Sequence, residues 1–272
     1  MRSGFEEATA LESVEPSGET SEARVFRALV PDGWQQGKGA FGGVVIGILT
    51  RAILASEGDA ARRLRSLTAD LCAPLLPGPA EVRVTLLRRG ASMSFVEARL
   101  TQAGVVVARA SAALSATRAI APAAITYAPP RRPPYDDALL VPVAPPLGPV
   151  FAERYEYRST GPLPFAGGAE PAAEGWLREK RTPSVLDEAA IVGLLDAWWP
   201  TVFAVDTRPR AVATVGYTMQ LLVDPRTLPP AEPLFYRARG VAGADNFFIE
   251  MRELWAGDDV VAMNQQTFAL LA

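Results

Sequence analysis

Asp196, Thr214 and Gln266 are the polar residues of this chain whose types and positions could support a reaction. A carboxylate can serve as a general base, and it would work here with hydroxyl, amide and backbone N–H groups. Gly42 and Gly43 open an apolar stretch that predicts a helix, and free N–H groups at a helix start favour negative charge. The chain has no histidine, so Ser-His-Asp and Cys-His arrangements and histidine-bound metals are excluded.

Each of these residues also has an ordinary structural interpretation. Aspartate is common on the exposed face of a helix, and threonine needs no special reason in a strand. The register of the last strand leaves two alternatives, because a shift of one residue would turn Gln265 inward instead of Gln266. Gly42 and Gly43 could serve the close packing of a helix on a sheet. The functional interpretation therefore depends on a comparison between two halves of the sequence.

Residues 39–117 and 182–270 read as two copies of one pattern, a helix followed by four strands. The predicted helices span 41–56 and 184–199, and the predicted strands are 65–75, 80–89, 92–102 and 105–116 in the first copy and 211–223, 233–242, 246–256 and 259–270 in the second. The best local match sets residues 95–99 against 248–252, with one residue inserted in the last turn of the second copy.

The alignment of the two copies shows that the polar residues belong to only one of them. Asp196, Thr214 and Gln266 lie in the second copy, and the residues matched to them in the first are, in order, Thr50, Ser66 and Ala112. This asymmetry predicts one working site in the second half, completed by the first half.

The surrounding pattern predicts apolar helices wrapped by antiparallel strands. Apolar residues recur in 41–56 at the spacing of one helix face. Residues 80–89 and 92–102 alternate apolar and polar side chains, as in an antiparallel sheet with one exposed face. The prediction also includes an irregular or briefly helical segment over 1–20 and a helix start at 182–184. Further strands are predicted near 22–30, 151–159 and 175–180.

Between the copies, residues 121–149 contain nine prolines and predict an extended connector. The expected organisation is an N-terminal unit over 1–120, the connector over 121–149, and a C-terminal unit with the polar site over 150–272.

Composition excludes several classes of protein. A net charge of −3 with scattered Lys and Arg argues against nucleic-acid binding. The chain has no run of about 18 apolar residues and no basic leader, so we expect a cytoplasmic protein without a membrane span. Cys72, the single cysteine, is expected in the core of a strand. The glycines of 37–42 fit G-x-G-x-x-G, but the strand that a dinucleotide site requires before them is missing.

The sequence resembles the acyl-CoA thioesterase II-like family of the double hotdog thioesterase superfamily over nearly its whole length. The residues that carry the resemblance are 39–43, 66–68, 74–78, 88–92 and 95–96 in the first half, and Asp196, 212–214, 261–262 and Gln266 in the second. The resemblance implies an α+β fold, a double hotdog, in which each of two fused repeats has a long helix wrapped by a curled antiparallel sheet.

The resemblance also implies a function, the hydrolysis of a coenzyme A thioester to free acid and thiol. Asp196, Thr214 and Gln266 match the family's catalytic residues, which orient and deprotonate a water, and a backbone N–H near Gly42 or Gly43 receives the carbonyl oxygen. The expected partner is acyl-CoA as substrate, with no metal or bound cofactor, and exposed sheet edges favour a homodimer or a larger homo-oligomer.

Some alternatives stay open at this point. Family members often have a histidine near the strand after the first helix, and its absence here is compatible with a non-catalytic acyl or acyl-CoA binding protein. A hotdog hydratase would need histidine and is disfavoured. Tryptophans are expected in the core, with lining of an acyl tunnel as the alternative for Trp34, Trp198 and Trp199. Solvated hairpin charges are the expectation for Arg88 and Arg89, with contacts to coenzyme A phosphates as the alternative.

Overall fold

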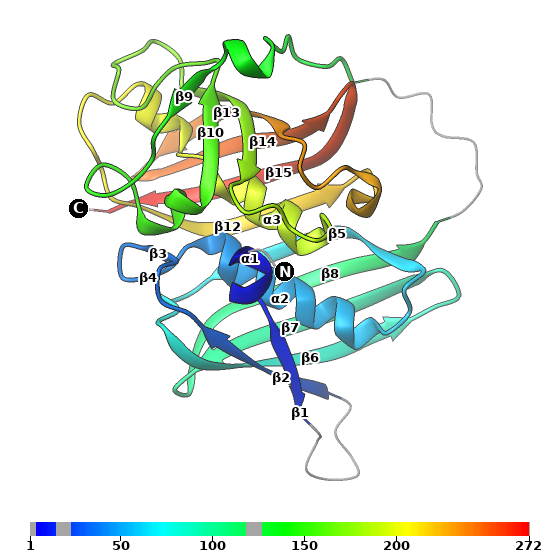
Figure 1. Ribbon diagram of the computed structural model, residues 1–272. Helices are drawn as coiled ribbons and strands as arrows, with labels where there is room; N and C mark the ends of the chain where they lie inside the picture. The colour runs from blue at the N-terminus through cyan, green and yellow to red at the C-terminus, as the bar shows by residue number, and fades with distance from the viewer. Residues whose placement is uncertain (1–3, 15–22, 118–126, 272) are drawn as a thin grey trace.

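The computed structural model describes residues 4–14, 23–117 and 127–271. Their strands form one antiparallel sheet of 13 strands and a separate two-stranded hairpin. Figure 1 shows two halves, one above the other, with one main helix of each half lying near their junction. Parts of the predicted lead, of the strand from residue 22 and of the connector fall outside the described residues.

The first half contains the longer of the two main helices. Its elements are α1 (Gly4–Ala8), β1 (Leu11–Val14), β2 (Ala23–Val30), β3 (Gln35–Gln36), β4 (Gly39–Ala40), α2 (Gly42–Glu57), β5 (Arg62–Leu71), β6 (Gly78–Arg89), β7 (Met93–Gln102) and β8 (Val105–Ala116). Helix α2 follows Phe41 in an extended conformation and ends at Gly58, whose φ of 72° gives a left-handed cap that glycine adopts without strain. The prediction of a helix over 41–56 is confirmed.

The second half repeats this order with a shorter helix. Its elements are η1 (Tyr135–Asp137), β9 (Leu139–Val141), η2 (Val150–Arg154), β10 (Tyr155–Ser159), β11 (Ala172–Glu179), α3 (Glu188–Ala197), η3 (Thr201–Ala204), β12 (Val212–Leu221), η4 (Pro225–Thr227), β13 (Leu234–Ala244), β14 (Phe247–Ala256) and β15 (Asp259–Leu270). The predicted strands agree with the observed ones to within a few residues, except that residues 150–154 form a 3₁₀ turn and the described part of the connector contains η1 and β9.

The prediction of a long helix in each half is wrong for the second half, where α3 has 10 residues. The predicted start near 182–184 fails because Asp187 is the N-cap, and its side chain accepts a hydrogen bond from the N–H of Ala190 at 2.8 Å. The helix ends at Ala197 because Trp198 is extended, and Pro200 follows, a residue that has no N–H to donate.

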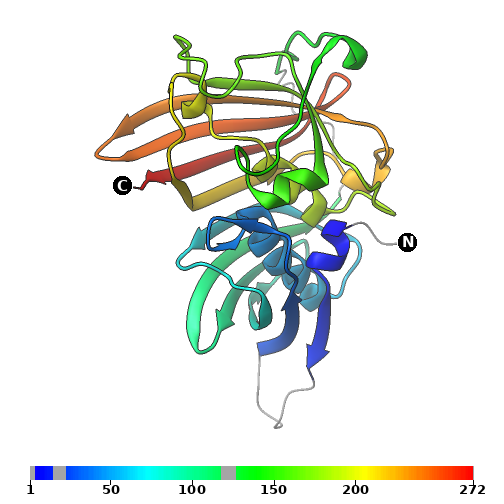
Figure 2. The ribbon, with the colours of Figure 1, turned by 60° about the vertical axis from the view of Figure 1, so that its left-hand side comes forward.

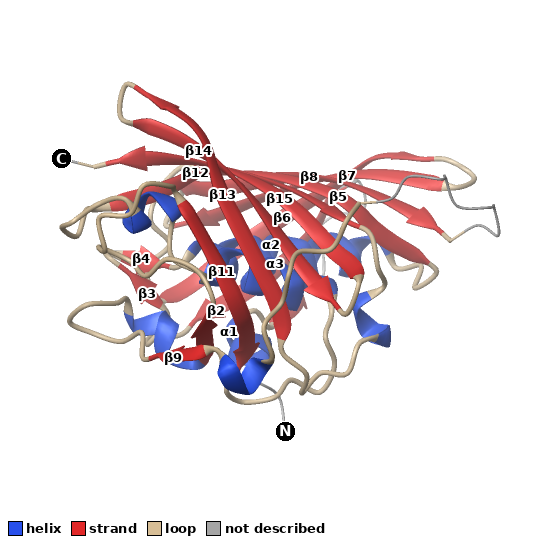
Figure 3. Ribbon diagram, turned by 90° about the horizontal axis from the view of Figure 1, so that it is seen from above, coloured by secondary structure: helices blue, strands red, loops and turns tan. Residues whose placement is uncertain are grey.

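The two halves share a single sheet because β5 pairs with β12. The strand order is β1-β2-β6-β7-β8-β5-β12-β15-β14-β13-β11-β10-β9. Seen from above, the sheet extends across the molecule and α2 and α3 lie on one side of it (Figure 3). The two helices pack against each other, and their buried side chains join those of both halves in one core.

Register within the sheet shows which residues of the two halves are equivalent. Thr68 of β5 faces Thr218 of β12 at the centre of the sheet. Ala112 and Gln266 each pair with the residue that precedes this threonine in its strand, which confirms their predicted match. Thr214 is different, because it pairs two residues beyond Gln266 and corresponds to Leu64 instead of Ser66. Both strands have a bulge at this point, so the bulge leaves the correspondence unchanged, and the predicted match of Ser66 with Thr214 is wrong by two residues.

The predicted match of residues 95–99 with 248–252 is wrong by one residue. Ala112 pairs with Val96, whereas Gln266 pairs with Glu250. The equivalent pairs are therefore Val96 with Glu250 and Ala98 with Arg252, and no residue is inserted in the last turn. Two charged residues of the second half thus replace two apolar residues of the first on the inner face of the sheet.

Helix α1 lies at the junction of the two halves, close to α2 and α3 (Figures 1 and 2). Phe5 of α1 is fully buried, and its ring occupies the space beside Gly47 of α2 and Gly193 of α3. A Cβ at either glycine would come within 2.8 Å of that ring. In the described part of the chain no helix is long and apolar enough to span a bilayer.

Candidate active site

Asp196 lies in the last turn of α3, a helix in which every residue is buried. Such a helix has no exposed face, so a carboxylate on it lies inside the protein, and Asp196 is only 7% exposed. This contradicts the interpretation of Asp196 as an ordinary surface residue. A buried carboxylate needs hydrogen-bond partners or a nearby positive charge.

Gln266 and Thr214 extend from Asp196 as a short chain of hydrogen bonds. The Nε2 of Gln266 donates to Asp196 Oδ1 at 3.0 Å, and the hydroxyl of Thr214 donates to Gln266 Oε1 at 3.4 Å. Gln266 is fully buried, whereas the neighbouring Gln265 is exposed, which decides the register in favour of Gln266. The structure therefore brings together the three polar residues that the sequence analysis selected.

The glycines at the start of α2 lie against the same carboxylate. The N–H of Gly43 donates a hydrogen bond to Asp196. A Cβ at Gly42 would lie 2.7 Å from Asp196 Oδ2, so the backbone there approaches the carboxylate more closely than any other residue type allows. A Cβ at Gly43 would also meet the Phe41 ring at 2.4 Å and the Cα of Gly193 at 3.1 Å, so close packing contributes as well.

Arg252 and Glu250 form a buried ion pair beside Asp196 that the sequence analysis did not select. Glu250 Oε1 accepts from both Nε, at 2.9 Å, and Nη2 of Arg252. Arg252 Nη1 donates to the carbonyl of Leu195 at 2.8 Å and lies 4.0 Å from Asp196 Oδ1. The sequence does contain a feature that could have identified this pair. It places two charged residues on a strand face whose other residues, Phe248 and Leu254, are apolar.

The electrostatics of the site change the pKa of Asp196. Burial raises the pKa of Asp196 above its ordinary value, and this effect exceeds the opposing influences of the Arg252 charge and of the hydrogen bonds from Gln266 and Gly43. A general base works best when its pKa lies near the operating pH, and an ordinary aspartate is far below that range. The environment therefore moves Asp196 in the direction that base catalysis needs.

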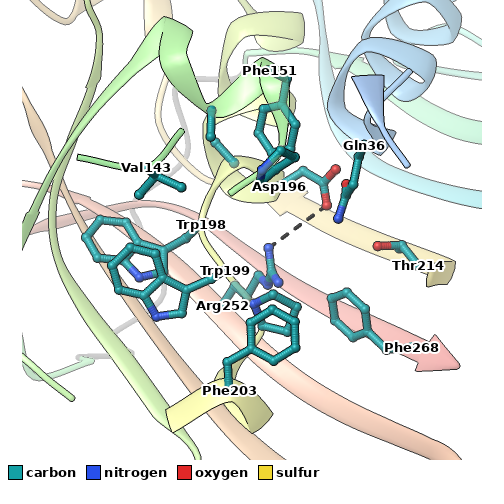
Figure 4. Close-up of a pocket in the computed structure, with 14 residues that line it drawn as sticks. Gln36, Val143, Phe151, Asp196, Trp198, Trp199, Phe203, Thr214, Arg252 and Phe268 are labelled. Atoms are coloured by element: carbon teal, nitrogen blue, oxygen red, sulfur yellow. Dashed lines mark ion pairs between the residues drawn. The ribbon is translucent and has the colours of Figure 1, made fainter. Parts of the chain in front are cut away.

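A cavity of about 60 Å³ lies next to Asp196, Thr214 and Arg252. Five aromatic side chains form part of its walls: Phe151, Trp198, Trp199, Phe203 and Phe268. Figure 4 shows Gln36, from the first half, beside Asp196 and Thr214 of the second. Gln36 is exposed, so this side of the site faces solvent.

Two of the three tryptophans considered for an acyl tunnel, Trp198 and Trp199, line this cavity. Trp34 instead stacks on Phe41 in the core, with 5.9 Å between ring centroids.

Three other residues that the sequence analysis considered lie away from the cavity. Arg89 pairs with the buried Glu57 at 3.0 Å, and Arg88 is exposed beside it on β6. Cys72 is exposed, so the expectation of a core cysteine is wrong. It follows the last residue of β5, where the chain leaves the sheet.

Comparison with known families agrees with this geometry. Profiles of the acyl-CoA thioesterase N-terminal and C-terminal domains match residues 30–115 and 129–270, in that order. The chain belongs to the acyl-CoA thioesterase family. The C-terminal match contains the whole chain of hydrogen bonds from Asp196 to Thr214.

Solved structures share the fold over nearly the full length of the chain. A conserved protein of unknown function with a hot dog fold from Alicyclobacillus acidocaldarius is 25% identical, covers 100% of this chain and 99% of its own, and has a TM-score of 0.87. An acyl-CoA thioesterase II from Mycobacterium marinum is 18% identical, with 98% and 96% covered and a TM-score of 0.72. Among curated proteins no sequence gives a significant match.

Proposed function

We propose that this member of the acyl-CoA thioesterase family hydrolyses an acyl-CoA thioester to a free acid and coenzyme A. The observation that carries the proposal is the hydrogen-bonded chain Asp196–Gln266–Thr214, in which Asp196 and Gln266 are buried, beside a cavity lined in part by aromatic side chains. We also infer that the fold is a double hotdog formed by duplication, because the ladders of the two halves correspond residue by residue about Thr68 and Thr218.

The proposed reaction begins with a water held near Asp196 by Thr214 and Gln266. The carboxylate takes one proton from this water as its oxygen bonds to the thioester carbonyl carbon, and the carbonyl oxygen becomes an anion. Collapse of that intermediate breaks the C–S bond, and the proton on Asp196 passes to the departing thiolate. Water and thioester are consumed, and acid and thiol are released.

The start of α2 is the proposed source of oxyanion stabilisation. Because the N–H of Gly43 already donates to Asp196, the geometry favours Gly42 over Gly43 as the donor to the carbonyl oxygen. One such donor is typically worth about 10²–10³ in rate. The aromatic walls formed by Trp198, Trp199 and Phe268 would hold the acyl group, and Gln36 lies where coenzyme A would leave the site.

The test is thiol release from acyl-CoA esters of increasing chain length, for the native chain and Asp196→Asn. The variant keeps the size of the side chain and removes the base, so we expect a loss of about 10²–10⁴ in rate. Asp245→Asn, on the exposed tip of the β13–β14 hairpin, is the matched control and should leave the rate unchanged.

The outcomes separate the enzyme from its alternative. If the native chain binds acyl-CoA but releases no thiol from any ester, the protein is a non-catalytic acyl-CoA binding protein. If Asp196→Asn retains the native rate, another group is the base and the proposed mechanism is wrong.

A further inference from the structure

The buried pair Glu250 and Arg252 raises a question that the thioesterase mechanism does not answer. Both side chains are almost completely buried, at 0% and 1% exposure. Removing two charges from water is expensive, and a buried pair is often no more stabilising than apolar residues of similar size. Stability of the fold is therefore a weak reason for the pair.

The first half of the chain shows that the fold does not require this pair. At the equivalent positions of β7 it has Val96 and Ala98, both buried and apolar. That half forms the same sheet on the same kind of helix with no ion pair at this place. The pair is present only in the half that contains Asp196, so its explanation lies in the site.

The contacts of the pair hold the backbone on both sides of the cavity-lining segment. Arg252 Nη1 donates to the carbonyl of Leu195, the residue before Asp196. Glu250 Oε2 accepts from the N–H of Thr201, just after the segment 198–200. The end of α3 and the segment containing Trp198 and Trp199 are thus fixed between two hydrogen bonds from one strand.

The charges around Asp196 give the pair a second effect. Arg252 is the strongest influence that lowers the pKa of Asp196, and Glu250 raises it more weakly. The remaining groups that interact with the carboxylate are uncharged. Gln266 and the Gly43 N–H donate hydrogen bonds to it. The nearby tyrosines are neutral because burial raises their pKa; they are Tyr155, Tyr157, Tyr217 and Tyr236. Arg252 is therefore the counter-charge of the base.

We propose that Arg252, held by Glu250, is a positioning residue for Asp196: it fixes the turn of α3 that carries the carboxylate and places a positive charge beside it. The inference rests on the proposed function, because it assigns a role within that reaction. It adds two residues on β14 to the three that are proposed to hold and activate the water.

The deciding variant gives the second half the residues of the first, Glu250→Val with Arg252→Ala. Because buried pairs can be exchanged for apolar residues, we expect it to fold. We expect kcat for thiol release to fall about 10²-fold, as for a misplacement of about 1 Å, with little change in KM. The acid limb of the pH profile should move to higher pH, because the group that lowers the pKa of Asp196 most is gone.

A matched control uses the exposed pair of the first half, Glu97→Val with Arg99→Ala. This pair has the same Glu-x-Arg pattern on β7, but its side chains are 42% and 55% exposed on the outer face. It should change neither kcat nor the pH profile. If the β14 double variant folds and also keeps native kcat and the native acid limb, the pair has only a structural role and the proposal is overturned.

If the double variant does not fold, Arg252→Lys tests whether Arg252 positions Asp196. Lysine keeps the charge but lacks the planar fork that bonds Leu195 and Glu250 together. We expect the acid limb to stay near its native position while kcat falls. Native kcat in this variant would show that the contact with Leu195 is unnecessary.

A readout without turnover separates this inference from the proposed function. Infrared difference spectra between native protein and Asp196→Asn report the carboxyl band of Asp196 as pH is varied. In the β14 double variant, the band of the protonated Asp196 carboxyl group should persist to higher pH than in the native protein. If no thiol is released by the native chain, this measurement alone decides the role of Arg252, and identical titrations would count against it.

Discussion

Asp196 is an acidic side chain enclosed by two helices and the inner face of a sheet. Its partners are an amide, a backbone N–H and a guanidinium 4.0 Å away, and these compensate only part of the loss of hydration. Its pKa is therefore raised in the folded protein relative to the unfolded chain. Because the folded state binds the proton more tightly, ionisation of Asp196 weakens folding as pH rises through the raised pKa.

Asp196→Asn should therefore be at least as stable as the native chain at neutral pH, although it should be inactive. The amide removes a buried charge while filling the same space. The difference in melting temperature should shrink as pH falls below the raised pKa, where Asp196 is protonated in the folded state. Thermal melts of both proteins across pH test this. A native chain that is clearly more stable than the variant at neutral pH would contradict it.

The polar residues of the site could be predicted because they interrupt an apolar pattern that the other half preserves. Gln266 against Ala112 is such a case, and the ladders confirm the match. Glu250 and Arg252 were not selected as site residues, because identical residues in 95–99 and 248–252 favoured an alignment that is one residue out of register. In a strand that error turns every side chain to the other face, so a buried pair was matched with an exposed one.

At the scale of elements, α1 is more than a lead into the first strand. Phe5 packs against both main helices at glycines, and its ring contacts Trp34 and Phe41 edge on. Gly47 and Gly193 allow the Phe5 ring to approach the backbones of α2 and α3 closely. These glycines are unfavourable for helix formation by about 1 kcal/mol each, and the packing of Phe5 explains their presence.

Gly193→Ala should destabilise the protein by about 1–3 kcal/mol through overpacking, despite the better helix propensity of alanine. The new Cβ would lie 2.7 Å from Phe5 Cε2. Combining it with Phe5→Leu should recover part of the loss, since the smaller side chain frees space. Denaturant unfolding measures both, with Gly90→Ala in an open hairpin as control. If Gly193→Ala does not change the free energy of unfolding, α1 can shift to make room for the new Cβ without loss of stability.

The long strands could be predicted from apolar patterns and from the repeat, whereas the short strands β1, β3, β4 and β9 and the length of α3 could not. Residues 184–187 were predicted as helical because 182–184 have the residue types of a helix start, but the side chain that accepts the hydrogen bond from the N–H of Ala190, and so caps the helix, is that of Asp187. Beyond the end of α3, the N–H of Thr201 donates to Glu250, a residue about fifty positions away, and this contact helps to hold the segment 198–200 in place. Such distant partners are invisible to local patterns.

At the scale of the whole molecule, the two halves share backbone hydrogen bonds as well as a core. The β5–β12 ladder joins them at its centre, where the hydroxyls of Thr68 and Thr218 lie 3.3 Å apart. Helices α2 and α3 pack together on the inner side. Neither half can lose its structure without exposing an edge and an apolar helix face of the other.

Unfolding in urea should therefore be a single cooperative transition of the whole chain. Tryptophan fluorescence reports on both halves, and circular dichroism reports on all strands. The tryptophans are Trp34 in the first half and Trp176, Trp198, Trp199 and Trp255 in the second. We expect coincident curves from the two probes. Two separated transitions would show that the halves are independent folding units.

The strands that end the sheet are its shortest members, β1 with 4 residues and β9 with 3. An edge offers unpaired N–H and C=O groups to any chain that approaches it, and long flat edges promote aggregation. In the part of the chain that the structure describes, these edge strands offer only four and three residues of backbone to another strand. Edges this short weaken the sequence-based argument that exposed sheet edges favour a homo-oligomer, and we expect copies of this protein, if they associate, to meet through the faces of the sheet or through loops instead of by adding strands to it.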